Sequence, residues 1–76
     1  MALTALFLGR LQDAAGAGGR TVEYRADVAA LIDSFEAELA QALRSPKVRV
    51  AVNGAFGATA LRDGDEVAFL PPVSGG

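Results

Sequence analysis

The feature that most constrains the fold is an apolar stripe with helical spacing that begins just after Asp27. Apolar residues recur three or four positions apart, as in an amphipathic helix that buries one face: Val28, Leu31, Ile32, Phe35, Leu39, Ala42 and Leu43. Asp27 is typical of a helix N-cap, because its carboxylate can accept a hydrogen bond from a free N–H of the first turn. Pro46 lacks an N–H and cannot continue a helix. The pattern therefore predicts one main helix between Asp27 and Pro46.

Two stretches before this helix and two after it resemble β-strands. Residues 3–8 and 67–70 are short apolar runs, which predict central strands with apolar side chains on both faces. Residues 20–26 and 47–53 alternate apolar and polar side chains, which predicts strands with one exposed face. This element order is that of the β-grasp (ubiquitin-like) fold. We therefore expect an α+β domain over residues 1–70, with a mixed four-to-five-stranded sheet, one main helix packed on one face, and the first and last strands adjacent at its centre.

Short polar and glycine-rich segments supply the connections. Residues 10–15 suit one helical turn, and residues 16–19, Gly-Ala-Gly-Gly, suit a hairpin loop, since they precede a strand and lack the spacing of a nucleotide-binding loop. Asn53-Gly54 predicts a turn, and residues 55–60 fit no single element. The acidic residues of segment 61–66 are better explained by a turn than by a metal site, because side chains on adjacent strand positions diverge.

The composition excludes most kinds of catalytic site within the chain. The 76 residues include neither His nor Cys, which excludes an imidazole base, a thiolate nucleophile and a thiolate metal site. The formal charge of -2 argues against nucleic acid or an anionic membrane as the main partner. No secretory leader or membrane-spanning run is evident. We expect a cytoplasmic domain that binds no metal or cofactor and acts through protein partners.

The sheet face turned away from the helix is expected to be unusually apolar. If Phe69 faces the helix, strand alternation turns Leu70 outward, and it turns Leu6 and Leu8 outward on the first strand. Phe56 lies nearby in the chain. An exposed apolar patch on a small domain usually marks a protein interface, although single exposed leucines are also common on protein surfaces.

The C-terminus is the part of the sequence that most clearly predicts a chemical function. Pro71 and Pro72 stop the last strand and stiffen its exit, and the chain closes with Gly75-Gly76. Residues 71–76 are predicted to form a flexible tail that spans roughly 20 Å when extended. Because glycine has no Cβ, the terminal carboxylate of Gly76 could pass through a channel too narrow for side chains.

Residues 63–76 resemble the C-terminal signature of the small, sulfur-carrier subunit of molybdopterin synthase, within the ubiquitin-like β-grasp sulfur carriers. Residues 6–8 and 50–53 resemble the first and third strands of that family. The resemblance implies that Gly76 bears a C-terminal thiocarboxylate and that Gly75 is the narrow neck of the tail.

The resemblance also implies a set of partners and no cofactor bound by the chain itself. A ubiquitin-activating-like adenylyltransferase would use ATP to join Gly76 to AMP, and a sulfur donor would replace AMP. The large subunit of molybdopterin synthase would then direct the sulfur to cyclic pyranopterin monophosphate, and this chain would be the non-catalytic small subunit of the heterotetramer. Leu8, Phe56 and Leu70 correspond to apolar partner contacts in the family, and the two prolines direct the tail.

Three other functions are compatible with the same tail. The chain could carry sulfur for thiamine synthesis or tRNA thiolation. It could be a protein modifier joined to lysines through Gly76. It could also be a β-grasp binding module whose tail is inert, since a fold does not fix a function.

Overall fold

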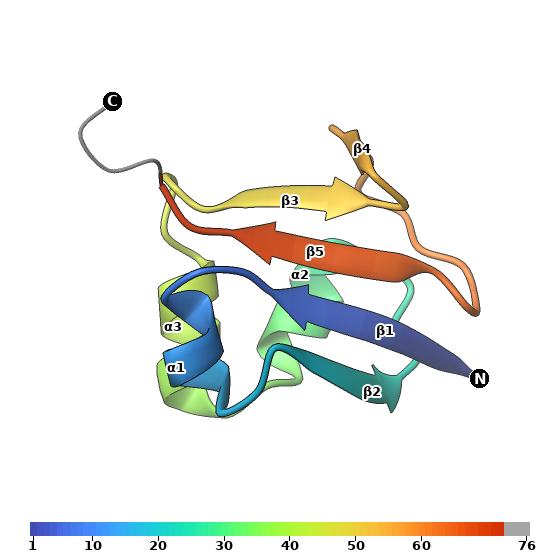
Figure 1. Ribbon diagram of the computed structural model, residues 1–76. Coiled ribbons are helices and arrows are strands. Elements are labelled where there is room, and N and C mark those ends of the chain that lie inside the picture. The colour runs from blue at the N-terminus through green and yellow to red at the C-terminus, as the bar shows by residue number, and fades with distance from the viewer. Residues whose placement is uncertain (73–76) are drawn as a thin grey trace.

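The protein folds as a five-stranded mixed sheet with its helices on one side (Figure 1). The computed structural model describes residues 1–72. The strands in chain order are β1 (Ala2–Phe7), β2 (Gly19–Glu23), β3 (Arg49–Val52), β4 (Ala55–Phe56) and β5 (Glu66–Leu70). They lie in the order β2-β1-β5-β3-β4, so β1 and β5 are parallel neighbours at the centre while β2 and β3 flank them antiparallel. The predicted β-grasp architecture is confirmed.

The predicted single helix is interrupted, and this part of the prediction was wrong. The segment forms two helices, α2 (Val28–Asp33) and α3 (Ala37–Leu43). Asp27 is the N-cap of α2 as expected, and its Oδ1 accepts a hydrogen bond from the Ala30 N–H at 2.8 Å. The interruption begins at Ser34, whose hydroxyl donates to the Leu31 carbonyl at 2.6 Å, and the extended backbone of Glu36 completes it. A serine hydroxyl that bonds to a nearby carbonyl in this way competes with the helical pattern.

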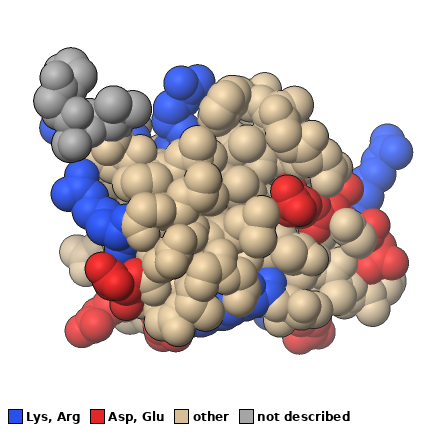
Figure 2. Space-filling view, in the orientation of Figure 1, with Lys and Arg blue, Asp and Glu red and all other residues tan. Residues whose placement is uncertain are grey.

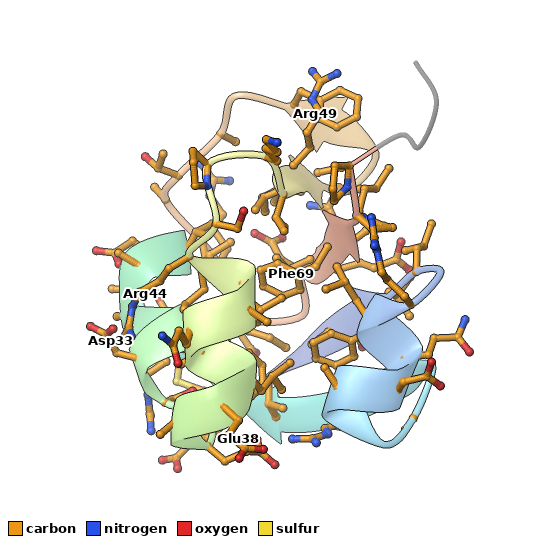
Figure 3. The ribbon with its side chains drawn as sticks, turned by 90° about the vertical axis from the view of Figure 1, so that its left-hand side faces the viewer. Asp33, Glu38, Arg44, Arg49 and Phe69 are labelled. Carbon is orange, nitrogen blue, oxygen red and sulfur yellow. The ribbon has the colours of Figure 1, made fainter. Side chains whose placement is uncertain are left out.

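The interruption places Phe35 in an aromatic cluster with one residue from each central strand. The rings of Phe7 and Phe69 stack at 5.6 Å, and Phe35 meets them edge-on at 5.7 and 6.3 Å. Edge-to-face and offset arrangements of this kind are the favoured geometries for aromatic pairs. Figure 3 shows Phe69 between β5 and α3. The other apolar helix residues in the core are Leu31, Ile32, Leu39, Ala40 and Leu43, whereas Ala42 is only partly buried.

Arg20 ties three neighbouring segments together beside this cluster. The short helix α1 (Leu11–Ala15), predicted as one helical turn, packs against α3 and is followed by the hairpin loop into β2. The Arg20 guanidinium donates to the Ala15 carbonyl at the end of α1 and pairs with the Glu36 carboxylate at 3.0 Å. The hydrogen bonds from Arg20 to the Glu36 carboxylate, with a further one from the Glu36 backbone N–H, hold the pKa of Glu36 below its ordinary value. The ion pair therefore fixes the interruption between α2 and α3 against β2.

The acidic turn before β5 has the structural role that its sequence predicted. Asp63 Oδ1 accepts a hydrogen bond from the Ala2 N–H at 2.7 Å, and Asp65 accepts from the Arg62 N–H at 2.8 Å and from Asn53 Nδ2 at 3.0 Å. The Asn53 and Arg62 groups lower the pKa of Asp65. Residues 1–72 hold no group of three potential metal-ligating acidic side chains, and none of their helices is long and apolar enough to cross a membrane.

Candidate docking face and tail exit

The side of the sheet that faces away from the helices carries a continuous apolar row. Leu6 of β1 lies beside Ala68 of β5, Ala68 lies opposite Ala51 of β3, and Ala51 lies opposite Phe56 of β4. Residues paired in register point to the same face of a sheet. The row therefore crosses four adjacent strands without a polar side chain.

A second apolar pair lies next to this row at the end of the central strands. Leu70 is the last residue of β5, and Leu8 follows β1 at the same level, with its N–H donating to the Phe69 carbonyl at 3.1 Å. Phe56 is 52% exposed and Leu8 is 38% exposed, while Leu6 and Leu70 are half-buried. We name the outer apolar face as the following residues: Leu6, Leu8, Ala51, Phe56, Ala68 and Leu70.

Charged side chains border this face rather than interrupt it. Figure 2 shows a largely uncharged central surface, with charged side chains of both signs around its border. No cavity is found among residues 1–72. The face is therefore suited to another protein surface rather than to an enclosed small molecule.

The structure brings together the three residues that sequence alone assigned to partner binding. Leu8, Phe56 and Leu70 all lie on the outer apolar face, from three different strands or strand ends. Their contact with a partner stays a prediction. Ala51 lies in the outer row but is buried between its neighbours.

The tail leaves the domain at the edge of this face. Leu70 is followed directly by Pro71 and Pro72, which are half-buried. Gly9 makes room for this exit, since a Cβ on Gly9 would lie 3.0 Å from Pro71 Cγ and the backbone there has a φ of 53°. Side chains rarely adopt that conformation. Gly75 and Gly76 lie outside the described residues.

Two residues that shape the site could not be identified from the sequence. Gly9 is one of them, because its contact with Pro71 depends on the parallel pairing of distant strands. The guanidinium of Arg49 lies 4.2 Å from the centre of the Phe56 ring, a cation–π distance. Figure 3 labels Arg49 beside an aromatic ring. The only sequence signal for this pair was the Asn53-Gly54 turn, which folds β4 back on β3.

The two carboxyl groups whose pKa values are shifted stabilise the fold and do not belong to the outer apolar face. The pKa values of Glu36 and Asp65 are both lowered by hydrogen bonds that favour the charged form. A general acid at neutral pH would need the opposite shift. What the outer apolar face and the tail exit can do is bind a partner and direct the chain end.

Comparisons with known proteins identify a family match and solved structures with the same fold. The ThiS family model matches residues 5–76. SAMP1 from Haloferax volcanii is 28% identical, with a TM-score of 0.80 over 100% of both chains. The HVO 2177 protein from the same organism is 33% identical, with a TM-score of 0.80, and the alignment covers 100% of this chain and 87% of that one.

A third solved structure shares the fold at lower identity. It is the complex of subunits 1 and 2 of the molybdopterin-converting factor from Helicobacter pylori, which is 23% identical with a TM-score of 0.67 over 100% of both chains. A comparison with curated protein sequences finds no match.

Proposed function

Because the chain belongs to the ThiS family, we propose that it is a sulfur carrier that bears a thiocarboxylate on Gly76 and serves as the small subunit of molybdopterin synthase. The observation that carries this proposal is the continuity between the outer apolar face and the tail. Leu70 belongs to that face and is bonded directly to Pro71. A partner protein that covers the outer apolar face therefore meets the start of the tail, Pro71, at the edge of the same interface.

The reactive group in this proposal is the terminal carboxylate of Gly76. A carboxylate is a poor electrophile, so an activating enzyme first joins it to AMP, and ATP loses pyrophosphate in that step. Hydrosulfide from a sulfur donor then attacks the acyl carbon, AMP leaves, and a thiocarboxylate remains. Its anionic sulfur is a strong nucleophile. The chain itself needs no His or Cys, because the acids and bases lie in its partners.

The fold of the Helicobacter pylori subunit complex supports a large-subunit partner for this chain. In the proposed complex, the large subunit covers Leu8, Phe56 and Leu70 and encloses the tail. The sulfur of Gly76 is then delivered to cyclic pyranopterin monophosphate, and two rounds of delivery complete the dithiolene of molybdopterin.

A second candidate function is favoured by the likeness to SAMP1, since a further structure of this Haloferax protein names it a small archaeal modifier protein. In that case the same adenylated Gly76 is attacked by a lysine amine of a target protein, and AMP leaves as an isopeptide bond forms. The two functions share activation and differ in the nucleophile.

Intact mass measurement separates these functions. The chain is incubated with a ubiquitin-activating-type adenylyltransferase from the same organism, ATP and a sulfur donor. A gain equal to the replacement of one oxygen by sulfur, followed by capture of a large synthase subunit, supports the proposal. Conjugates on lysines of other proteins support the modifier instead. If the chain is not adenylated at all, both proposals fail.

Deletion of Gly76 is the matched control. We expect the shortened chain to lose all sulfur loading while its thermal unfolding and its affinity for the large subunit change little. The expected losses are confined to chemistry because the buried core of the described residues is built from side chains between Leu3 and Phe69. Loss of folding together with loading would contradict this assignment.

A further inference from the structure

The two ends of the outer apolar face differ in net charge, although Arg62 lies at the acidic end. Arg49 lies opposite Leu70 at the tail end of the face, and Lys47 lies two residues before it. Arg10 follows Gly9, the residue in contact with Pro71. At the other end, Glu66 begins β5 after the acidic turn that contains Asp63 and Asp65. Figure 2 shows that charged side chains border the uncharged surface at both ends.

The basic group is not balanced by carboxylates within the described part of the chain. Arg20, Arg25 and Arg44 each form an ion pair with an acidic side chain there. Over residues 1–72, no ion pair is formed by Arg10, Lys47 and Arg49, or by Arg62 at the acidic end, although the full chain has more acidic than basic residues. Cations left without a partner beside an apolar face are available to a second protein.

Arg49 is the best-positioned of these cations. Its guanidinium lies against the exposed Phe56 ring, which limits the freedom of the side chain before any partner arrives. It donates no hydrogen bond to another side chain within residues 1–72. The planar guanidinium can therefore bind a carboxylate through two parallel hydrogen bonds.

We propose that the activating enzyme presents to this face a protein surface with acidic side chains around the opening that receives the tail, and that Arg49 binds one of those carboxylates. The inference rests on the proposed function and adds the chemistry by which the partner is recognised. The acidic end of the face faces basic or neutral groups of the same partner. Reversed docking brings like charges together at both ends, so charge sets the orientation in which the tail meets its channel.

Two features favour an acidic protein over a nucleic acid. The apolar row from Leu6 to Phe56 has no counterpart in a phosphate backbone, and burying it favours a protein surface. Asp63 and Glu66 at the far end of the face repel phosphates.

The test compares two charge reversals in adenylation by the activating enzyme. Arg49→Glu changes the tail end of the face, and Arg25→Glu makes the same change in charge beside β2, away from the face. ATP–pyrophosphate exchange is measured against the concentration of the carrier chain. We expect Arg49→Glu to raise KM about tenfold or more with kcat within about twofold, because a lost charge contact at an interface weakens association. Arg25→Glu should change KM less than about twofold.

Two further measurements separate recognition from stability. Arg49→Lys keeps the charge but loses the planar geometry, so its KM should lie between those of wild type and Arg49→Glu. Thermal unfolding of all three variants should match wild type closely, and the KM of Arg49→Glu should depend less on salt than that of wild type.

The outcomes distinguish this inference from the function on which it rests. Equal KM values for Arg49→Glu and Arg25→Glu, with wild type active, overturn the inference and leave the carrier function standing. Binding of a short RNA by wild type that Arg49→Glu abolishes also overturns it. Failure of wild type to be adenylated overturns the carrier function and the inference together.

Discussion

The two faces of the central strands are built from the same kinds of residue, but helices cover only one of them. On the helix side, Phe7, Val67 and Phe69 are fully buried. On the other side, Leu6 and Leu70 alternate with them along the same strands, and no helix covers them. Apolar character alone therefore does not decide burial in this domain. The helix side contributes to stability, and the uncovered side is left for a partner.

The largest expected effect is a loss of stability when a buried ring is removed from the helix side of the sheet. Phe69→Ala removes a ring from the aromatic cluster, and we expect a loss of about 3–5 kcal/mol in the free energy of unfolding. That is a large part of the total stability of a small domain. Urea unfolding followed by circular dichroism measures it. A loss below about 1 kcal/mol would mean that the cluster is not central to the core.

The matching change on the uncovered side should act on binding and not on stability. Phe56→Ser removes an exposed ring, so the unfolding free energy should change by less than about 0.5 kcal/mol. Affinity for the large synthase subunit should fall about tenfold or more, because buried aromatic anchors dominate protein interfaces. Calorimetric titration of both proteins checks this. Equal effects on stability and affinity would erase the contrast between the faces.

A smaller effect is expected where the two faces meet the tail. Gly9→Ala puts a Cβ close to Pro71 in a backbone conformation that side chains disfavour, at a cost of about 1–2 kcal/mol in unfolding free energy. The same change should redirect the tail and lower the rate of adenylation. Gly64→Ala is a control with a similarly positive φ and open space around the Cβ. It should cost similar stability without affecting adenylation.

The smallest expected effect is on stability at acidic pH. The pKa of Glu36 is lowered in the folded state by Arg20, so its ion pair stabilises the fold above the ordinary carboxyl value of 4.5 and is lost as pH falls through the lower folded value. Glu36→Gln should therefore show a smaller drop in melting temperature than wild type between about pH 5 and about pH 3. Calorimetric scans at a series of pH values measure both drops, and parallel curves would contradict the assignment.

Strand order and the direction of Phe69 and Leu70 could be predicted from sequence because period-two alternation and element order are local signals. The interruption at Ser34 could not, since the apolar stripe continues through it. The position of Phe35 against Phe7 and Phe69, with Arg20 holding Glu36, is a tertiary arrangement that overrides helical propensity.

The site was predictable to a different extent. The alternation of the central strands indicated that Leu8 and Leu70 face outward, with Phe56 nearby in the chain. The family resemblance then assigned all three residues to partner contacts. The pairing of Arg49 with the Phe56 ring depends on how β4 folds back across β3. Segment 55–60 carried too little periodicity to place that strand.

The central position of β5 has a mechanical consequence. The strand is hydrogen-bonded to β1 on one side and to β3 on the other, and its last residue leads into the tail. A pull on the tail acts along β5, so the hydrogen bonds on both sides are loaded in shear and share the force. An edge strand pulled away sideways would lose its bonds one after another. The domain can therefore be held by its end under tension while its fold stays intact.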